Sequence, residues 1–344
     1  MVKNMNEKNV NNSDLLLIYG AKLNNPNGDP DAENKPRIDL AMDINYVTDG
    51  RLKRYIRDYV IDRFDDKHVW VSKVNGKVVN AEERFNALEN AKSETDVLKA
   101  CIDTRLFGAT MAIKEKQKKE KGDKKPEAPK AVNEQKKAIR SITGAVQFSW
   151  GSSLHTVELV DSPGISSTFY GREARDGMEQ HGTIGKDWRL YYSLIAFRGT
   201  VSGFRARKTM LRESDVRALD DFTWIAIKEE TKTRSKLGHA PHLYLRVEFT
   251  DDETDIGDLR EYLDVTFEKH VRDIADINID YSRLVKVLIE HSDVIQAVFI
   301  RESGRIVSAN KKSFEDNLKN TPLEEKIHCL PHKWPEPINL LTIP

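Results

Sequence analysis

Residues 15–24 read LLLIYGAKLN, and after an intervening loop residues 50–64 read GRLKRYIRDYVIDRF. The first run starts with apolar residues at both alternating positions, as in a strand that is buried on both faces. In the second run, apolar residues from Leu52 to Phe64 recur at helical spacing and form one stripe. The two runs therefore predict a central buried strand followed by a long amphipathic helix.

Four further stretches extend this pattern to six elements. Strands are predicted at 145–150, 189–201 and 242–249, and a helix is predicted at 213–231. The order strand, helix, strand, strand, helix, strand is that of the α+β ferredoxin-like fold, which is also the topology of the RNA recognition motif (RRM). We therefore predict a ferredoxin-like, RRM-like βαββαβ palm over residues 15–250, interrupted by long insertions.

The first insertion, at 66–140, contains a type I′ turn signal at Asn75-Gly76, which predicts a hairpin between VWVSKV (69–74) and KVV (77–79). A helix is predicted at 81–100. Its stretch 114–137 holds ten lysines and five acids, and it is too polar to contribute to a core. The lysine-rich stretch is therefore predicted to be a mobile insertion.

The remaining segments flank or interrupt the palm. Residues 1–14 are polar and read as a disordered lead-in, and residues 160–187 are rich in glycine and polar groups and predict an extended excursion. Residues 251–344 form a C-terminal extension, with a helix near 281–291 and a short strand, VIQAVFI, which we expect to pack on the palm.

The 344 residues carry a net charge of zero, but the charges are unevenly placed. Residues 198–212 hold five Lys/Arg and no acid, whereas residues 251–280 hold eleven acids and three Lys/Arg. Such blocks suit a polyanion-binding face and an acidic face that meets a basic face on a second copy. Two distant cysteines and the absence of a long apolar run predict a cytoplasmic protein without membrane contact.

The first candidate site is the basic side of the long helix. Arg51, Lys53, Arg54 and Arg57 lie within two turns, and Thr48 or the following residue offers an N-cap. A positive helix flank beside a loop rich in Gly and Asn can hold phosphates through charge and backbone N–H groups together. The alternative is an ordinary solvated helix face.

Aromatic residues provide a second candidate. Phe169 and Tyr170 lie beside arginines in the excursion 160–187, where they are placed to wedge between or stack on unpaired bases, or to dock on the parent domain. Phe148 and Trp150 alternate along a strand, and core packing is favoured over base stacking for this pair.

Most of the catalytic motifs that the sequence suggests are incomplete. Gly185-Lys186 lacks the other residues of a P-loop, and the fragment HCLPH at 328–332 has no second cluster of zinc ligands. No cofactor and no metal site are expected. Asp29 and Asp31 leave a Mg²⁺-dependent RNase as an alternative.

Several long motifs together resemble the repeated backbone subunit of type I CRISPR Cascade complexes, the CRISPR-associated Cas-seven family, in its type I-B form. They are NPNGDPDAENKPRID (25–39), VTDGRLKRYIRDYV (47–60), DTRLFGATM (103–111), GAVQFSWGSSL (144–154) and GTIGKDWRLYYSLIAFRGTVS (182–202). The likeness runs from about residue 15 to residue 250, in order and at the right spacing.

The resemblance implies a hand-shaped, non-enzymatic protein of antiviral defence. Its palm would carry a thumb at 160–187 and fingers or a web at 66–140. Copies would line up head to tail in a helical filament along a CRISPR RNA, beside other Cascade subunits, with each thumb flipping one base. The remaining bases would stay free to pair with target DNA.

The resemblance also implies positions for RNA contacts. The family's guide-binding helix motif falls on Thr48, Arg51, Lys53, Arg54 and Arg57, and its first loop falls on Asn27 and Arg37. The base wedge falls on Ser167, Thr168, Phe169 and Tyr170. The chain has Ala145 and Ser152 where relatives often show proline and arginine, which puts a backbone contact at 152 in doubt.

Two other functions remain open. One is a metal-dependent RNase backbone subunit of the related type III kind, which would use Asp29 or Asp31. The other is a general single-stranded RNA module that acts alone.

Overall fold

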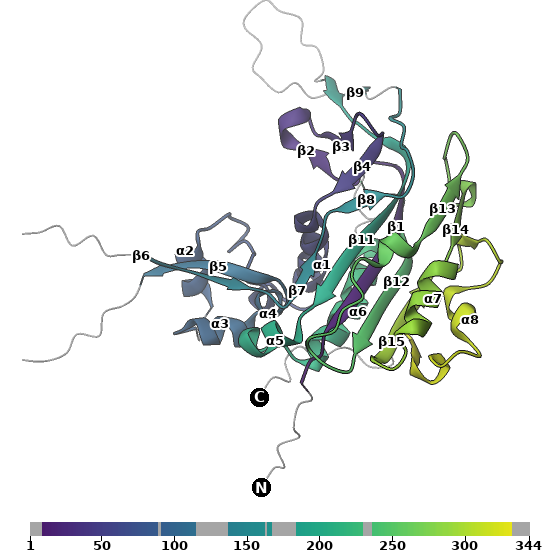
Figure 1. Cartoon of the computed structure of the whole chain (residues 1–344). Coiled ribbons are helices and arrows are strands. Elements are labelled where there is room, and N and C mark those ends of the chain that lie inside the picture. Colours follow the sequence, from purple (N-terminus) through teal and green to yellow (C-terminus); the bar gives the residue numbers. More distant parts are fainter. Residues whose placement is uncertain are drawn as a thin grey trace, which may run out of the picture.

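The computed structural model describes residues 9–88, 91–114, 137–161, 164–166, 184–229 and 236–331. Over these residues the chain is a mixed α+β structure built around one large sheet (Figure 1). The predicted wedge residues 167–170, most of the lysine-rich stretch, the first eight residues of the lead-in and residues 332–344 lie outside the described residues. No described helix is both long and apolar enough to cross a bilayer.

One ten-stranded sheet forms the centre of the molecule. Its strands are β1 (Ser13–Asn24), β2 (Gly28–Asp29), β3 (Lys35–Asp39), β4 (Ile44–Val47), β7 (Val146–Phe148), β8 (Gly151–Ser153), β11 (Leu190–Val201), β12 (His239–Phe249), β15 (Ile295–Glu302) and β17 (Ile327–Cys329). They run in the order β17–β15–β12–β1–β11–β8–β4–β3–β2, and β7 also pairs with β11. Only the β15–β17 pairing is parallel, so the sheet is mixed.

The strands predicted for the palm lie side by side at the centre of this sheet. β1 pairs with β11 from Ser13↔Val201 to Asn24↔Leu190, and on its other edge with β12. Both pairings are antiparallel, and so are those of β11 with β7 and β8. Each predicted strand is therefore present, within a few residues of its expected bounds.

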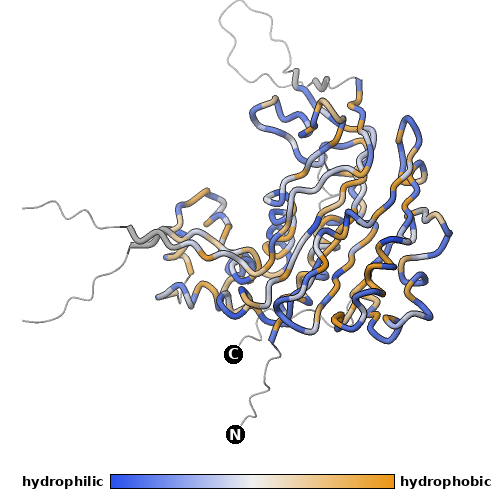
Figure 2. The backbone as a smooth tube through the Cα atoms, viewed as in Figure 1, coloured by the Kyte–Doolittle hydropathy of each residue, from blue (hydrophilic) through white to orange (hydrophobic). Residues whose placement is uncertain are grey.

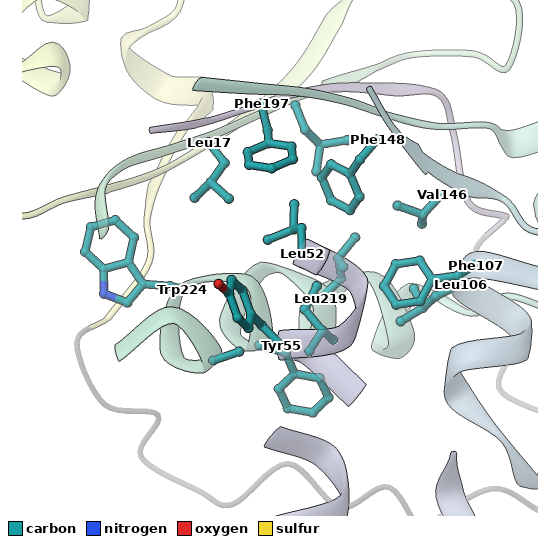
Figure 3. Packing of buried hydrophobic residues seen from close by; sticks show 14 of the residues in the cluster. Leu17, Leu52, Tyr55, Leu106, Phe107, Val146, Phe148, Phe197, Leu219 and Trp224 are labelled. Carbon is teal, nitrogen blue, oxygen red and sulfur yellow. The ribbon is translucent and has the colours of Figure 1, made fainter. Parts of the chain in front are cut away.

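One face of the sheet is covered by helices. These are α1 (Asp49–Arg63), α5 (Gly203–Thr209) and α6 (Glu213–Glu229). Leu52 and Tyr55 of α1 pack with Leu219 of α6 against Leu17 and Phe197 of the sheet (Figure 3). The predicted apolar stripe of the long helix is thus the surface that α1 buries.

The C-terminal region covers the opposite face. It contributes α7 (Ser282–Glu290), α8 (Phe314–Leu318) and a small sheet of β13 (Asp264–Phe267), β14 (Ile277–Asp280) and β16 (Val307–Ser308). Leu16 and Ile18 of β1 pack there with Leu284 and Leu288 of α7. Both faces of β1 are therefore buried, as its unbroken apolar run predicts, and Figure 2 shows apolar residues along the central strands.

The described residues of the segment 66–143 project from the sheet with a small core of their own (Figure 1). They contain α2 (Ala81–Ala87), α3 (Glu94–Ala100), α4 (Ile102–Phe107) and the hairpin of β5 (Gly108–Lys114) and β6 (Lys137–Thr143). A buried ion pair between Arg105 and Asp215, at 2.7 Å, ties α4 to α6. The single helix predicted at 81–100 is instead two helices.

The short 3-10 helices complete the described chain. They are η1 (Pro30–Ala32), η2 (Asp66–His68), η4 (Leu259–Tyr262), η5 (Ile274–Asp276) and η6 (Glu324–Lys326). The turn predicted at Asn75-Gly76 has φ of 51° and 76°, as a type I′ turn requires, but only the bridge Val74↔Lys77 flanks it within the described residues 66–88. The hairpin prediction is therefore right about the turn and wrong about the strands.

Two further expectations are corrected. The stretch 25–39, predicted as a loop, contains β2 and β3, and β3 joins the sheet through β4. Phe148 belongs to the core as favoured, but Trp150 is exposed. The break between β7 and β8 falls at Ser149 and Trp150, so the alternation that would have buried Trp150 is interrupted there.

Candidate nucleic-acid interface

The loop after β1 and the N-terminal end of α1 meet in one hydrogen-bonded junction. The Asn27 Oδ1 accepts hydrogen bonds from the Thr48 backbone N–H at 2.9 Å and from the Thr48 hydroxyl at 3.0 Å. Thr48 is the N-cap of α1, and its Oγ1 accepts from the Arg51 N–H at 3.2 Å. The Arg37 N–H donates to the Asn27 carbonyl at 3.2 Å. Four of the predicted residues are thus brought together.

A buried lysine supports this loop through hydrogen bonds to its backbone. The Lys236 Nζ donates to the carbonyls of Asn25 and Pro26, the latter at 3.1 Å, and the Tyr55 hydroxyl donates to the same Pro26 carbonyl at 3.1 Å. Burial, with Lys236 and Arg51 nearby, lowers the pKa of His239 well below its usual value, so the imidazole beside this junction is neutral. The role of Lys236 was not predictable from sequence, because nothing local marks a lysine as buried.

Arg37 and Asp29 form a partly exposed ion pair at 3.0 Å. Asp29 also accepts from the Asp31 N–H at 3.2 Å and caps η1. One of the two carboxylates considered for an RNase site, that of Asp29, is therefore bonded to a neighbouring guanidinium and a backbone N–H. Across the described residues, no three His, Cys, Asp or Glu side chains come together as a metal site requires.

Lys53 and Arg57 are mostly buried, with side chains 11% and 12% exposed. The Lys53 Nζ lies 2.9 Å from an Asp49 carboxylate oxygen, and the Arg57 Nε donates to Asp103 at 2.9 Å. Asp103 also accepts from the backbone N–H groups of Trp70, at 2.6 Å, and of the next residue. Both cations are thus committed to contacts within the chain.

Arg54 is more accessible, with its side chain 37% exposed, and Arg51 is half-buried. The Arg54 Nε donates to Asp58 at 2.9 Å, one turn further along α1. The Arg51 guanidinium lies over the Tyr55 ring, 4.5 Å from its centroid, at the Thr48 end of the helix. The four basic side chains of α1 therefore do not share one face, and Arg51 is the one that joins the junction with Asn27 and Thr48.

Two short strands lie at the beginning and the end of the predicted thumb. They pair with each other, and the chain beside them contacts the loop after β1. β9 (Gly164–Ser166) and β10 (Ile184–Lys186) form a two-stranded sheet. The Lys186 Nζ lies 2.8 Å from Glu33 of the loop, and the Lys35 Nζ lies 4.4 Å from the centroid of the Trp188 ring. The base of the thumb and the loop after β1 are therefore neighbours, and the wedge residues lie between β9 and β10 in sequence.

The basic and acidic segments are neighbours rather than opposed faces. Arg207 of α5 forms an ion pair with Asp252 at 2.6 Å. Phe204 of the same helix is 53% exposed, and the Lys208 Nζ lies 4.2 Å from its ring centroid. Arg207 therefore pairs with an acid of its own chain, and the expectation that the acidic block meets a basic face on a second copy stays a prediction.

Sequence comparison identifies the family. The family model described as "CRISPR-associated protein Cas7" matches residues 11–282. The chain is also 31% identical over 310 residues to "CRISPR-associated protein Cas7" of Haloferax volcanii, covering 86% of this chain and 88% of that relative. The chain belongs to the CRISPR-associated protein Cas7 family. The match in this Cas7-family chain contains the whole junction and ends at Ser282, the first residue of α7.

Solved structures similar to this Cas7-family chain come from CRISPR complexes. A chain of "CRISPR RNA-guided surveillance complex, pre-nicking" is 14% identical with a TM-score of 0.46, covering 85% of this chain and 93% of that one. A chain of "CRISPR RNA-guided surveillance complex" is 12% identical with a TM-score of 0.41, covering 88% and 91%. At these scores they add nothing to the family assignment.

Proposed function

We propose that this Cas7-family chain is the CRISPR-RNA-binding backbone subunit of a type I, I-B-like, Cascade effector. Copies assemble head to tail along the guide in the cytoplasm, beside other Cascade subunits, and present its bases for pairing with target DNA in antiviral defence. The observation that carries this proposal is the junction in which Asn27 and Thr48 fix the loop to the start of α1, where Arg51 lies.

The chemistry of the junction suits a sugar-phosphate strand. A helix N-terminus directs backbone N–H groups outward and carries a partial positive charge, and an arginine adds a fixed charge. A protein that accepts any guide sequence should contact phosphate and sugar and leave the base edges free. Arg51, at the N-terminal end of α1, meets that requirement through its charge and reads no base.

The sheet supports the interpretation as a ferredoxin-like palm. The order β12–β1–β11–β8, antiparallel throughout, follows the pairing expected of the βαββαβ arrangement, with α1 and α6 packed in one core. In this interpretation the segment 66–140 provides the fingers or web, and 160–187 provides the thumb with its wedge at Ser167–Tyr170. The C-terminal region then closes the sheet face that an RRM leaves open.

We further propose that the chain has no catalytic activity. Asp29, one of the two carboxylates considered for an RNase, is already bonded to Arg37. The discriminating experiment incubates the protein and its guide with complementary RNA and Mg²⁺. Regularly spaced cuts, lost in Asp29→Asn, would establish the type III kind of RNase instead.

The site is tested with Arg51→Ala and a matched control at the far end of the same helix. Arg63 is an exposed arginine that pairs with Glu229 at 3.2 Å, and Arg63→Ala removes the same charge away from the junction. We expect Arg51→Ala to weaken guide binding by about threefold to tenfold, equally for unrelated spacers, and to reduce the salt slope by about one. Filter binding over a salt series measures both quantities.

The control should leave both affinity and slope close to wild type. Equal behaviour of Arg51→Ala and Arg63→Ala would remove the proposed site. A loss that depends on the spacer sequence would contradict binding through the sugar-phosphate strand.

A further inference from the structure

The turn between β3 and β4 presents large apolar side chains to solvent. Leu40 is 84% exposed and Met42 is 65% exposed. The turn is nevertheless held in place, because the Asp39 carboxylate accepts from the Ala41 N–H at 2.9 Å and the Asp43 carbonyl accepts from Val157 at 2.8 Å. We call residues 39–43 the apolar turn. Two adjacent apolar side chains on a fixed turn are typical of a contact surface.

A second exposed apolar side chain lies on α5. Ala206 and Thr209 form the buried face of this helix, which leaves Phe204 outward. The Arg207 guanidinium and the Lys208 Nζ lie 5.6 Å and 4.2 Å from the Phe204 ring centroid. We call the exposed residues of this surface the basic patch; they are Phe204, Arg205, Arg207 and Lys208.

The two surfaces lie at opposite ends of the sheet (Figure 1). α5 follows Val201, the last residue of β11. The apolar turn lies toward the other end, because Tyr46 of β4 pairs with Ser152, Ser152 pairs with Ala196, and the chain before Tyr46 runs toward the start of β11. A contact between unlike surfaces on two copies leaves one of each free, so the contact can repeat along a row.

The charges of the two surfaces are complementary. The apolar turn carries Asp39 and Asp43, and residues 38–48 contain no Lys or Arg. The basic patch carries three cations, of which Arg207 pairs with Asp252. Methionine and aromatic side chains also make favourable contacts, which suits Met42 against Phe204.

We propose that the apolar turn of one copy docks on the basic patch of the next copy. Leu40 and Met42 contact Phe204, and Asp43 lies beside Lys208. These two surfaces would form the contact between neighbouring copies in the head-to-tail assembly described under the proposed function. The docking rests on that function in one respect, because the guide is what brings the copies together.

The test exchanges the two charges between copies. Asp43→Lys and Lys208→Glu are each expected to weaken assembly on a long guide RNA by about tenfold, measured by analytical ultracentrifugation. An equimolar mixture of the two variants should assemble to within about threefold of wild type, because each mutated turn then meets a mutated patch of opposite charge. A mixture that stays as dispersed as the single variants would overturn the proposal.

A third variant tests the apolar part of the contact. Leu40→Ser with Met42→Ser should also disperse the copies, and Val78→Ser, which changes an exposed valine on another surface, should not. Equal assembly of both variants would contradict docking through the turn.

Binding of a guide fragment that one copy covers separates the two proposals. All of these variants should bind the fragment like wild type. If Lys208→Glu lost fragment binding while assembly persisted, the basic patch would hold nucleic acid and the docking would be wrong. If the wild type failed to bind the fragment but the charge exchange still restored association of the protein alone at high concentration, the proposed function would fail and the docking would stand.

Discussion

Helices α1 and α5 are both rich in Lys and Arg and differ in how these cations are used. In both helices, Lys and Arg outnumber Asp and Glu. In α1, three cations are each bonded to a carboxylate: Lys53, Arg54 and Arg57. In α5, Arg207 is the cation for which an ion pair is seen among the described residues. Asp49 and Asp58 lie one turn from Lys53 and Arg54 on α1 itself. Asp103 reaches Arg57 from α4, and α5 contains no acid. Charge counts alone therefore overstate the free charge of a long helix.

The largest expected effect is on stability, and it comes from Arg57. Arg57→Ala leaves the Asp103 carboxylate buried without its guanidinium, so we expect the free energy of unfolding to fall by about 3–5 kcal/mol. Urea denaturation measures this change. A loss below about 1 kcal/mol would show that Arg57 is as available as the cations of α5.

The next effect concerns the buried cation that supports the loop. Lys236→Met removes the hydrogen bonds to the carbonyls of Asn25 and Pro26. We expect guide affinity to fall by about tenfold with an unchanged salt slope, since the lysine positions the loop and contacts no phosphate. Filter binding over a salt series distinguishes this outcome from that of Arg51→Ala.

A slope reduced by one unit would make Lys236 a phosphate contact. Tyr55→Phe provides a milder variant, because it removes one hydrogen bond to the same Pro26 carbonyl and keeps the charge. It should weaken guide binding less than Lys236→Met does, again with an unchanged slope.

The smallest effect is expected at Arg54. Its ion pair with Asp58 is about one-third exposed on both sides, so Arg54→Ala should change the free energy of unfolding by less than about 1 kcal/mol. Added salt should diminish even that difference, because exposed charges are screened. A larger loss of unfolding free energy that persists in high salt would show that Arg54, like Arg57, forms a buried ion pair.

Sequence patterns predicted the central strands, α1, α6 and α7, because each buries a periodic apolar set. The Thr48 cap was also predictable, since a threonine precedes the first helical residues. The contacts that decide which cations are available could not be predicted, because the partners are far apart in sequence. Asp103, for example, lies 46 residues from Arg57 along the chain. Prolines favoured a loop at 25–39, but Pro36 is tolerated in β3, which lies near one edge of the sheet.

The large sheet ends in very short strands, β17 with three residues and β2 with two. Long unpaired edges recruit strands from other molecules and lead to fibres, and short edges leave few backbone groups for such recruitment. Many copies of this chain could therefore crowd along one polymer without fusing edge to edge, and an order imposed by side chains and turns would remain reversible.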